Sequence, residues 1–167
     1  VPTGKDVNEG GLSRHHIIKA VEESLKRLGT DHLDFYFLHK FDSETHIEEI
    51  LYALDDLRRK GKILYSGVSN WAAWQIAIAL GISEYKRLAR FECIQPMYNL
   101  VKRQAEVEIF PLAQSEKLGV ITYSPLGAGL LTGKYKIKNK PKQGRIISNK
   151  RYALRYANTV YYEIAER

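Results

Sequence analysis

Apolar, strand-like segments recur along this chain at a nearly constant spacing. Four of them begin near residues 33, 63, 92 and 120, so the steps between them are 30, 29 and 28 residues. Helix-forming segments fill the intervals, and this alternation predicts a parallel sheet with helical crossovers. Helices that cover such a sheet allow its strands to be apolar throughout, as segment 33–38 is.

The expected helices have recognisable ends. Capping residues precede the apolar stripes, and glycine follows them. Thr45 and Glu48 form a capping box, and Gly81 is expected to break the helix that precedes it. We predict helices over 14–28, between Thr45 and Gly61, over 72–80, from Pro111 to Leu118, and from about residue 150 to the end.

Two architectures contain such a repeat, the doubly wound sheet and the (β/α)8 barrel. No G-x-G-x-x-G sequence follows any strand, so the dinucleotide fingerprint of the doubly wound fold is missing. Polar residues instead follow every strand, as in barrel enzymes, which assemble their sites at the carboxyl ends of strands. A full barrel takes about 250 residues. We therefore predict an α/β fold, a partial (β/α)8 TIM barrel of about four strands, as one domain over 1–167.

Charge is unevenly distributed along the chain. Residues 1–117 hold 16 Lys/Arg and 17 Asp/Glu, whereas 118–162 hold nine bases and no acid. We interpret residues 134–149 as a solvated basic loop. Nucleic acid is not an expected partner, because the basic and aromatic residues do not interleave on a recognisable module.

Several features that the sequence lacks bear on the cellular location of the protein and on metal binding. Cys93 is the single cysteine, so no internal disulfide can form. No apolar run approaches the roughly 20 residues of a membrane helix, and residues 1–11 show no signal-peptide pattern. The histidines lack ligand spacing with Cys93. We expect a cytoplasmic protein without a metal or a membrane partner.

The polar groups at the strand ends each have an ordinary structural explanation. His39 could be a hydrogen-bonded strand-end histidine, and Ser69 and Asn70 could cap the next helix. Gln95 could satisfy backbone groups, and Tyr123 could belong to the core. Their equivalent positions in one repeat favour a shared site instead.

Four stretches with this order and spacing resemble the aldo-keto reductase family. They are GLSRHHIIKAVEESLKRLGTDHLDFYFLHKFD (11–42), GKILYSGVSN (61–70), IQPMYNL (94–100) and GVITYSPLGAGLLTGKY (119–135). The resemblance implies an NADP(H)-dependent oxidoreductase that reduces aldehydes or ketones to alcohols. It extends to non-catalytic regulators, the β-subunits of voltage-gated potassium channels, which tend to lack the histidine that His39 represents.

The resemblance assigns roles residue by residue. His39 matches the catalytic histidine that polarises the substrate carbonyl. The cofactor-binding matches are Ser69, Asn70 and Gln95 for the nicotinamide carboxamide, Tyr123 for stacking on its ring, and Ser124, Leu126 and Gly127 for the pyrophosphate. Trp71, which follows the Ser-Asn pair, is a candidate for substrate binding or for a structural role above the sheet.

The family's catalytic tetrad also contains an Asp, a Tyr and a Lys. The resemblance places all three before Val1, and the segment that grips the adenosine 2′-phosphate beyond Arg167. Tyr36 and Tyr98 lie in the wrong motifs to replace the general acid. We therefore expect this chain to be incomplete and inactive alone, and a homo-oligomer is a possible way to cover its open sheet.

Overall fold

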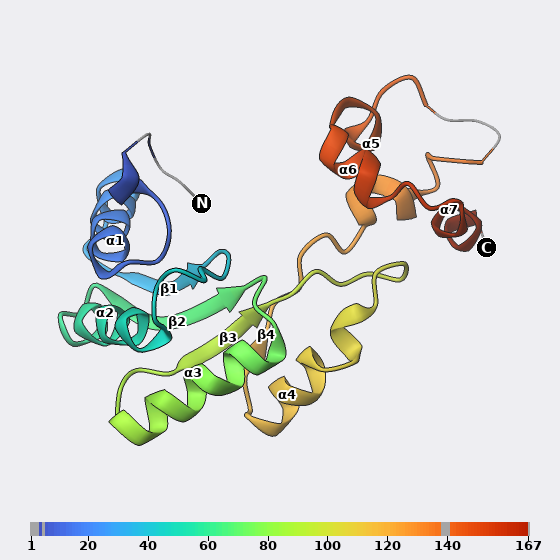
Figure 1. The fold of residues 1–167 in the computed structure, drawn as a ribbon. Helices are drawn as coiled ribbons and strands as arrows, with labels where there is room; N and C mark the ends of the chain where they lie inside the picture. The colour runs from blue at the N-terminus through green and yellow to red at the C-terminus, as the bar shows by residue number, and fades with distance from the viewer. Residues whose placement is uncertain (1–3, 5, 138–140, 167) are drawn as a thin grey trace. The chain divides into compact units, whose positions relative to one another are not determined.

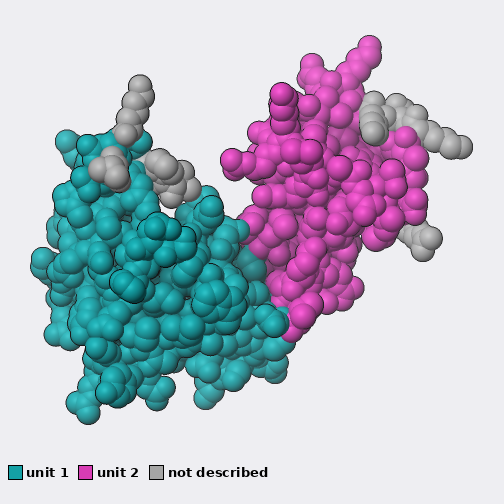
Figure 2. All heavy atoms as spheres, in the orientation of Figure 1, with its two compact units in different colours: residues 1–96, 108–121 teal, residues 97–107, 122–167 magenta. Residues whose placement is uncertain are grey.

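The protein is described by a computed structural model covering residues 4, 6–137 and 141–166. These residues group into two compact units (Figure 2): unit 1 is 1–96 with 108–121, and unit 2 is 97–107 with 122–167. Each unit is described by itself. The assignment of 1–167 to one domain stays a prediction.

Unit 1 alternates helices and strands along the chain (Figure 1). Its elements are η1 (Val7–Glu9), α1 (Arg14–Leu28), β1 (Leu33–Leu38), α2 (Ile47–Arg59), β2 (Ile63–Ser69), α3 (Ala73–Lys86), β3 (Phe91–Gln95), α4 (Ile109–Ser115) and β4 (Gly119–Val120). The strands form one sheet in the order β1-β2-β3-β4, and every pair is parallel. Sequential order without reversal is what a segment of a barrel requires, which confirms the predicted fold class.

The helices of unit 1 bury their apolar faces over one side of this sheet (Figure 1). From α1, Ile17, Val21 and Leu25 are buried at helical spacing, and α2 contributes the stripe from Ile50 to Leu57. Fully burying an aliphatic side chain contributes about 1.5–3 kcal/mol before conformational entropy is subtracted. The helix–sheet interface is therefore the main source of stability for unit 1.

The opposite side of the sheet carries aromatic rings. Phe35 and Tyr65, paired across β1 and β2, have ring centroids 5.3 Å apart, and Phe35 lies 6.1 Å from Phe37. The Phe37 ring crosses β2 at Gly67, where a Cβ atom would lie 2.6 Å from both Phe37 Cε1 and the Cys93 carbonyl oxygen. Glycine at position 67 is thus required by close approach.

The predicted start of α2 is wrong. The helix begins after His46, which makes no side-chain cap. The Thr45 hydroxyl donates instead to Asp42 Oδ2 at 2.7 Å, and the Glu48 carboxylate accepts from Lys86 Nζ at 2.7 Å. Both members of the expected capping box are engaged by residues outside the helix. By contrast, α1 has a regular N-cap, since the Ser13 hydroxyl accepts from the His16 N–H at 3.3 Å.

The predicted break at Gly81 is also wrong, because α3 continues through it to Lys86. Glycine costs a helix interior only about 1 kcal/mol relative to alanine. Side chains on both sides of position 81 are buried in the core of unit 1, and their burial outweighs that cost. Among them are Ile76, Leu80 and Ser83. The helix ends where Arg87 adopts a left-handed conformation, with φ 56°.

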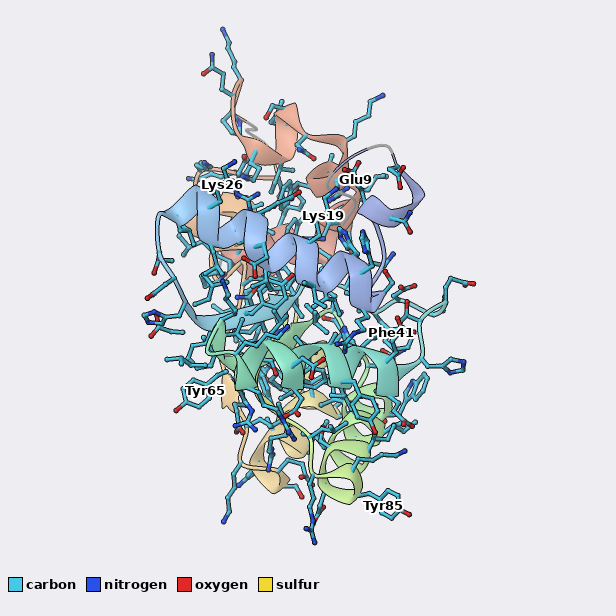
Figure 3. All side chains as sticks on the ribbon, turned by 90° about the vertical axis from the view of Figure 1, so that its left-hand side faces the viewer. Glu9, Lys19, Lys26, Phe41, Tyr65 and Tyr85 are labelled. Carbon is cyan, nitrogen blue, oxygen red and sulfur yellow. The ribbon has the colours of Figure 1, made fainter. Side chains whose placement is uncertain are left out.

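Two carboxylates and an ion pair secure the connections of unit 1. Buried Asp55 of α2 accepts from the Ala89 N–H at 2.9 Å and from Arg59 Nε at 2.5 Å, which ties α2 to the entry of β3. Asp42, after β1, accepts from the Leu12 N–H at 2.7 Å, which ties it to the entry of α1. Figure 3 shows Lys19 of α1 close to Glu9 of η1, with 2.9 Å between Nζ and Oε1.

Unit 2 is built around a small aromatic core. Its elements are η2 (Gln104–Glu106), the irregular turns of η3 (Gly127–Thr132), α5 (Arg145–Ser148), α6 (Lys150–Arg155) and α7 (Thr159–Glu166). Leu130, Tyr135, Ile146 and Tyr156 are buried together. The segment 134–149, predicted as a basic loop, thus includes α5, and its residues 138–140 lie outside the described residues.

The single helix predicted from residue 150 onwards is instead two helices. Asn158 separates α6 from α7, and its side-chain oxygen accepts from the Val160 N–H at 3.0 Å. Asparagine is a strong N-cap, so it starts a new helix here.

In the parts of the chain that the structure describes, no helix is long and apolar enough to cross a bilayer. Nor do three or more His, Cys, Asp or Glu side chains come together there as metal ligands.

Replacing Gly81 by alanine should raise the free energy of unfolding by about 0.5–1 kcal/mol. The added Cβ would meet no atom within 4 Å, and alanine lowers the entropy of the unfolded chain. Urea denaturation followed by tryptophan fluorescence measures the change, since Trp71 and Trp74 both lie in unit 1. Gly67→Ala is the matched control and should destabilise by about 1–3 kcal/mol through overpacking. A stabilising Gly67→Ala would contradict the described crossing of Phe37.

The stability of unit 1 should also fall in acid through Asp42. Burial raises the pKa of this carboxyl, but hydrogen bonds from Thr45 and from the backbone of Leu12 and Glu44 outweigh burial and lower it overall. A carboxyl whose pKa is lower in the folded than in the unfolded state stabilises fully above the unfolded pKa. That contribution is lost as the pH falls through the folded pKa.

Asp42→Asn should therefore cost about 1–3 kcal/mol at pH 7 and show a smaller loss of stability between about pH 5 and 3 than the parent. Denaturation curves across this pH range give the difference. Asp34→Asn, at an exposed carboxylate on β1, should stay within about 0.5 kcal/mol of the parent. Parallel pH curves for the parent and Asp42→Asn would refute the assignment.

Candidate functional site

The carboxyl ends of β1, β2 and β3 meet at one edge of the sheet, which we call the rim. Ser69 pairs with Gln95 in register, and His39 directly follows β1. Three side-chain hydrogen bonds join the rim: Asn70 Nδ2 donates to the His39 carbonyl at 2.8 Å and to Ser69 Oγ at 3.0 Å, and Ser69 Oγ donates to the Gln95 carbonyl at 2.8 Å. Four predicted site residues of unit 1 are thus brought together.

One rim residue has an unusual backbone conformation. Asn70 has φ 58°, a left-handed conformation that asparagine tolerates better than most residues. The side-chain bonds of Asn70 to β1 and to Ser69 compensate for that cost. Non-glycine residues held this way are concentrated at functional sites.

The rim offers the donors and acceptors that an amide ligand needs. The His39 and Asn70 side chains are exposed, and that of Gln95 is half-buried. Ser69 is buried, and its hydroxyl hydrogen already bonds the Gln95 carbonyl. A carboxamide presents one acceptor and two N–H hydrogens. Both Nδ2 hydrogens of Asn70 already bond His39 and Ser69, so Asn70 holds the shape of the rim, and the Gln95 side-chain amide can offer a ligand a donor and an acceptor. Ser69 contributes by orienting both of its neighbours.

Trp71 lies in the core of unit 1. It is 5% exposed and packs edge-on against Phe41 and Phe91, with ring centroids 4.9 and 5.4 Å away. These contacts agree with the structural role considered for Trp71. That Trp71 contacts a substrate stays a prediction.

The remaining predicted residues lie in unit 2. Tyr123 bridges to Met97, and its carbonyl accepts from the Tyr98 N–H at 3.2 Å. Its approach to the rim stays a prediction, because the units are described separately. The following turn, residues 124–129, has positive φ at Ser124, Gly127, Ala128 and Gly129. The Gly127 N–H bonds the Ser124 carbonyl at 2.9 Å, so that N–H closes the turn itself.

Sequence reasoning missed Asn99 as a site residue. It is 5% exposed, and its Nδ2 donates to the Ser124 carbonyl at 2.9 Å. Asn99 stands in the stretch IQPMYNL, but only Gln95 of that stretch carried a predicted role. Its burial, which obliges the amide to have partners, is seen only in the structure, because Asn99 lies outside the regular repeat of strands and helices.

The two tyrosines considered as replacement acids have the wrong electrostatics. Burial raises the pKa of Tyr36. The pKa of Tyr98 is raised mainly by its hydrogen bond to Glu106, at 2.5 Å between the hydroxyl and Oε1. A general acid near neutral pH is favoured by a lowered tyrosine pKa, and the pKa values of both residues are shifted the other way.

Comparison with known proteins agrees with this arrangement. The Aldo/keto reductase family matches residues 3–166. A probable voltage-gated potassium channel subunit beta of Arabidopsis thaliana is 40% identical over 90% of this chain and 44% of its own length. An uncharacterized oxidoreductase of Bacillus subtilis is 36% identical over 97% of the chain and 52% of its own length. Human aflatoxin B1 aldehyde reductase member 2 is 38% identical, with coverages of 86% and 40%.

The chain thus spans about half the length of these curated relatives. Enzymes and channel subunits both occur among them, so similarity alone gives the family and not the individual activity. With the family match over almost the whole chain and the parallel β-α order of unit 1, the chain belongs to the aldo/keto reductase family.

Proposed function

We propose that this chain supplies the nicotinamide-binding rim and the carbonyl-polarising histidine of an NADP(H)-dependent reductase of aldehydes or ketones. The observation that carries the proposal is the hydrogen-bonded rim, in which Ser69 and Asn70 link the ends of three strands. When bound, the cofactor supplies the hydride. The residues of the chain hold and orient the reactants.

The rim residues fit a nicotinamide by their chemistry. The side-chain amide of Gln95 can pair with a carboxamide, and Ser69 and Asn70 hold together the three strand ends around it. Because the backbone of the rim is held before a ligand arrives, less ordering entropy is lost on binding. The turn after Tyr123 is the corresponding candidate for the pyrophosphate.

His39 is the candidate group for the substrate. Its exposed ring follows β1, and Asn70 fixes its backbone carbonyl. A ring N–H donated to a carbonyl oxygen stabilises the negative charge that develops there during reduction. Neither Tyr36 nor Tyr98 is proposed as the general acid, because the pKa values of both are raised. A cytoplasmic location completes the proposal.

The second candidate is a non-catalytic nucleotide-binding regulator. The 40% identity to a probable channel β-subunit favours it. Such a protein would share the rim but would not reduce a carbonyl. His39 favours the enzyme, because regulation needs no group to polarise a substrate.

Titration of the chain with NADPH, followed by the fluorescence of the reduced nicotinamide, should show saturable binding. Gln95→Ala removes an amide from the rim and should weaken binding about tenfold, the effect of losing one ordinary hydrogen bond. Ser69→Ala should weaken it through misplacement of Asn70. Ser43→Ala, at an exposed position in another loop, is the control and should bind as the parent does. If none of these proteins binds NADPH, the proposed function is wrong.

In the whole protein that carries this chain, His39→Ala should lower kcat for aldehyde reduction about 10²-fold or more, because one donor to the developing oxyanion is lost. The affinity for NADPH should change less than about twofold, since the exchange removes no donor to the cofactor. Steady-state kinetics with NADPH and a reactive aldehyde give both values. Equal turnover in the two proteins would exclude this role, and NADPH binding without turnover in either would favour the regulator.

A further inference from the structure

We infer that Asn99 is a positioning residue for the nucleotide: it holds the 124–129 turn in its binding shape and is itself held by Tyr156. This inference rests on the proposed function, because it concerns the turn assigned to the pyrophosphate. Every residue involved lies in unit 2.

The Asn99 side chain is fully engaged at the base of the turn. Its Nδ2 donates to the Ser124 carbonyl at 2.9 Å and lies 3.3 Å from the Tyr156 hydroxyl, while its Oδ1 accepts from the Val101 N–H at 3.1 Å. Its backbone also forms two hydrogen bonds with Lys102, at 3.0 and 3.2 Å. A buried amide with partners for both ends has one well-defined orientation.

The turn needs such support because its backbone is costly. Ser124 and Ala128 have φ 60° and 59° without being glycine, a strained conformation that persists only when the surroundings enforce it. Asn99 bonds the carbonyl of the first of these residues, where the turn begins. The same Ser124 carbonyl also accepts from the Gly127 N–H, so fixing it fixes the start of the turn on which the following residues depend.

Tyr156 supports the same turn from a second point. It is fully buried, and its Cε1 would lie 3.6 Å from a Cβ atom at Gly127. The Tyr156 ring therefore packs against the middle of the turn at Gly127. Its hydroxyl lies beside the Asn99 amide, which bonds the start of the turn at Ser124. Lys102 adds a contact to the C-terminal helices, with its Nζ 2.8 Å from the Tyr161 hydroxyl.

The decisive variant is Asn99→Asp. It keeps an oxygen for the Val101 N–H but replaces the Nδ2 donor by a carboxylate oxygen facing the Ser124 carbonyl. Hydrogen–deuterium exchange of the chain without nucleotide should become at least about tenfold faster at the amides of 124–129, since their protection depends on local opening. The Val101 amide should keep its protection. Tyr156→Phe should produce a smaller change at the same amides.

Tyr161→Phe is the matched control, because it removes a hydroxyl from the same aromatic cluster without touching Asn99. It should leave exchange at 124–129 unchanged. Uniformly faster exchange across unit 2 in Asn99→Asp, matching a general loss of stability, would overturn the inference, as would unchanged exchange in the turn.

Binding separates this inference from the proposed function. Asn99→Asp should weaken NADPH and 2′-phospho-ADP-ribose, which both contain the pyrophosphate, about tenfold. Reduced nicotinamide mononucleotide, which lacks the pyrophosphate, should bind as it does to the parent. If the parent binds none of the three, the proposed function fails while exchange still decides the role of Asn99. If the parent binds NADPH and Asn99→Asp binds it equally well, the inference alone fails.

Discussion

Parallel pairing of β1, β2 and β3 is the constraint on which the rest of unit 1 depends. Because the strands run the same way, their carboxyl ends meet at one edge, and short side chains can link residues 26 and 31 positions apart. Ser69 and Asn70 both donate to backbone carbonyls of neighbouring strands. The rim is therefore an extension of the sheet by side-chain hydrogen bonds, and its geometry follows from the strand pairing beneath it.

Elements defined by apolar spacing were predictable, and elements defined by competition between local and distant contacts were not. Helix α1 occupies the predicted residues, because its cap and its stripe agree. At Gly81 the local signal for a break opposed a buried helical face, and the buried face prevailed. The Thr45 hydroxyl, expected to cap α2, donates instead to Asp42. The spacing of residues within the helix could not reveal that contact.

The same distinction applies to the candidate site. His39, Ser69 and Gln95 could be identified because each occurs at or directly after the end of a strand in a regular repeat. Asn99 could not, because its partners are 25 and 57 positions away and come from irregular turns and a short helix. Irregular segments carry no period from which a contact can be inferred. The division into two units follows this line, since unit 1 contains the periodic elements.

The contact between Asn99 and Tyr156 has a kinetic consequence. A loop of 57 residues closes more slowly than the roughly 30-residue steps between the strands of unit 1, because closure entropy grows with loop length. Tyr156 should therefore reach the 124–129 turn somewhat later during refolding than neighbouring strands of unit 1 pair. Pulse-labelling of the amides of the turn would record late protection, and early protection would show that the turn assembles without the C-terminal helices. A chain synthesised from its N-terminus would thus acquire the rim well before the turn.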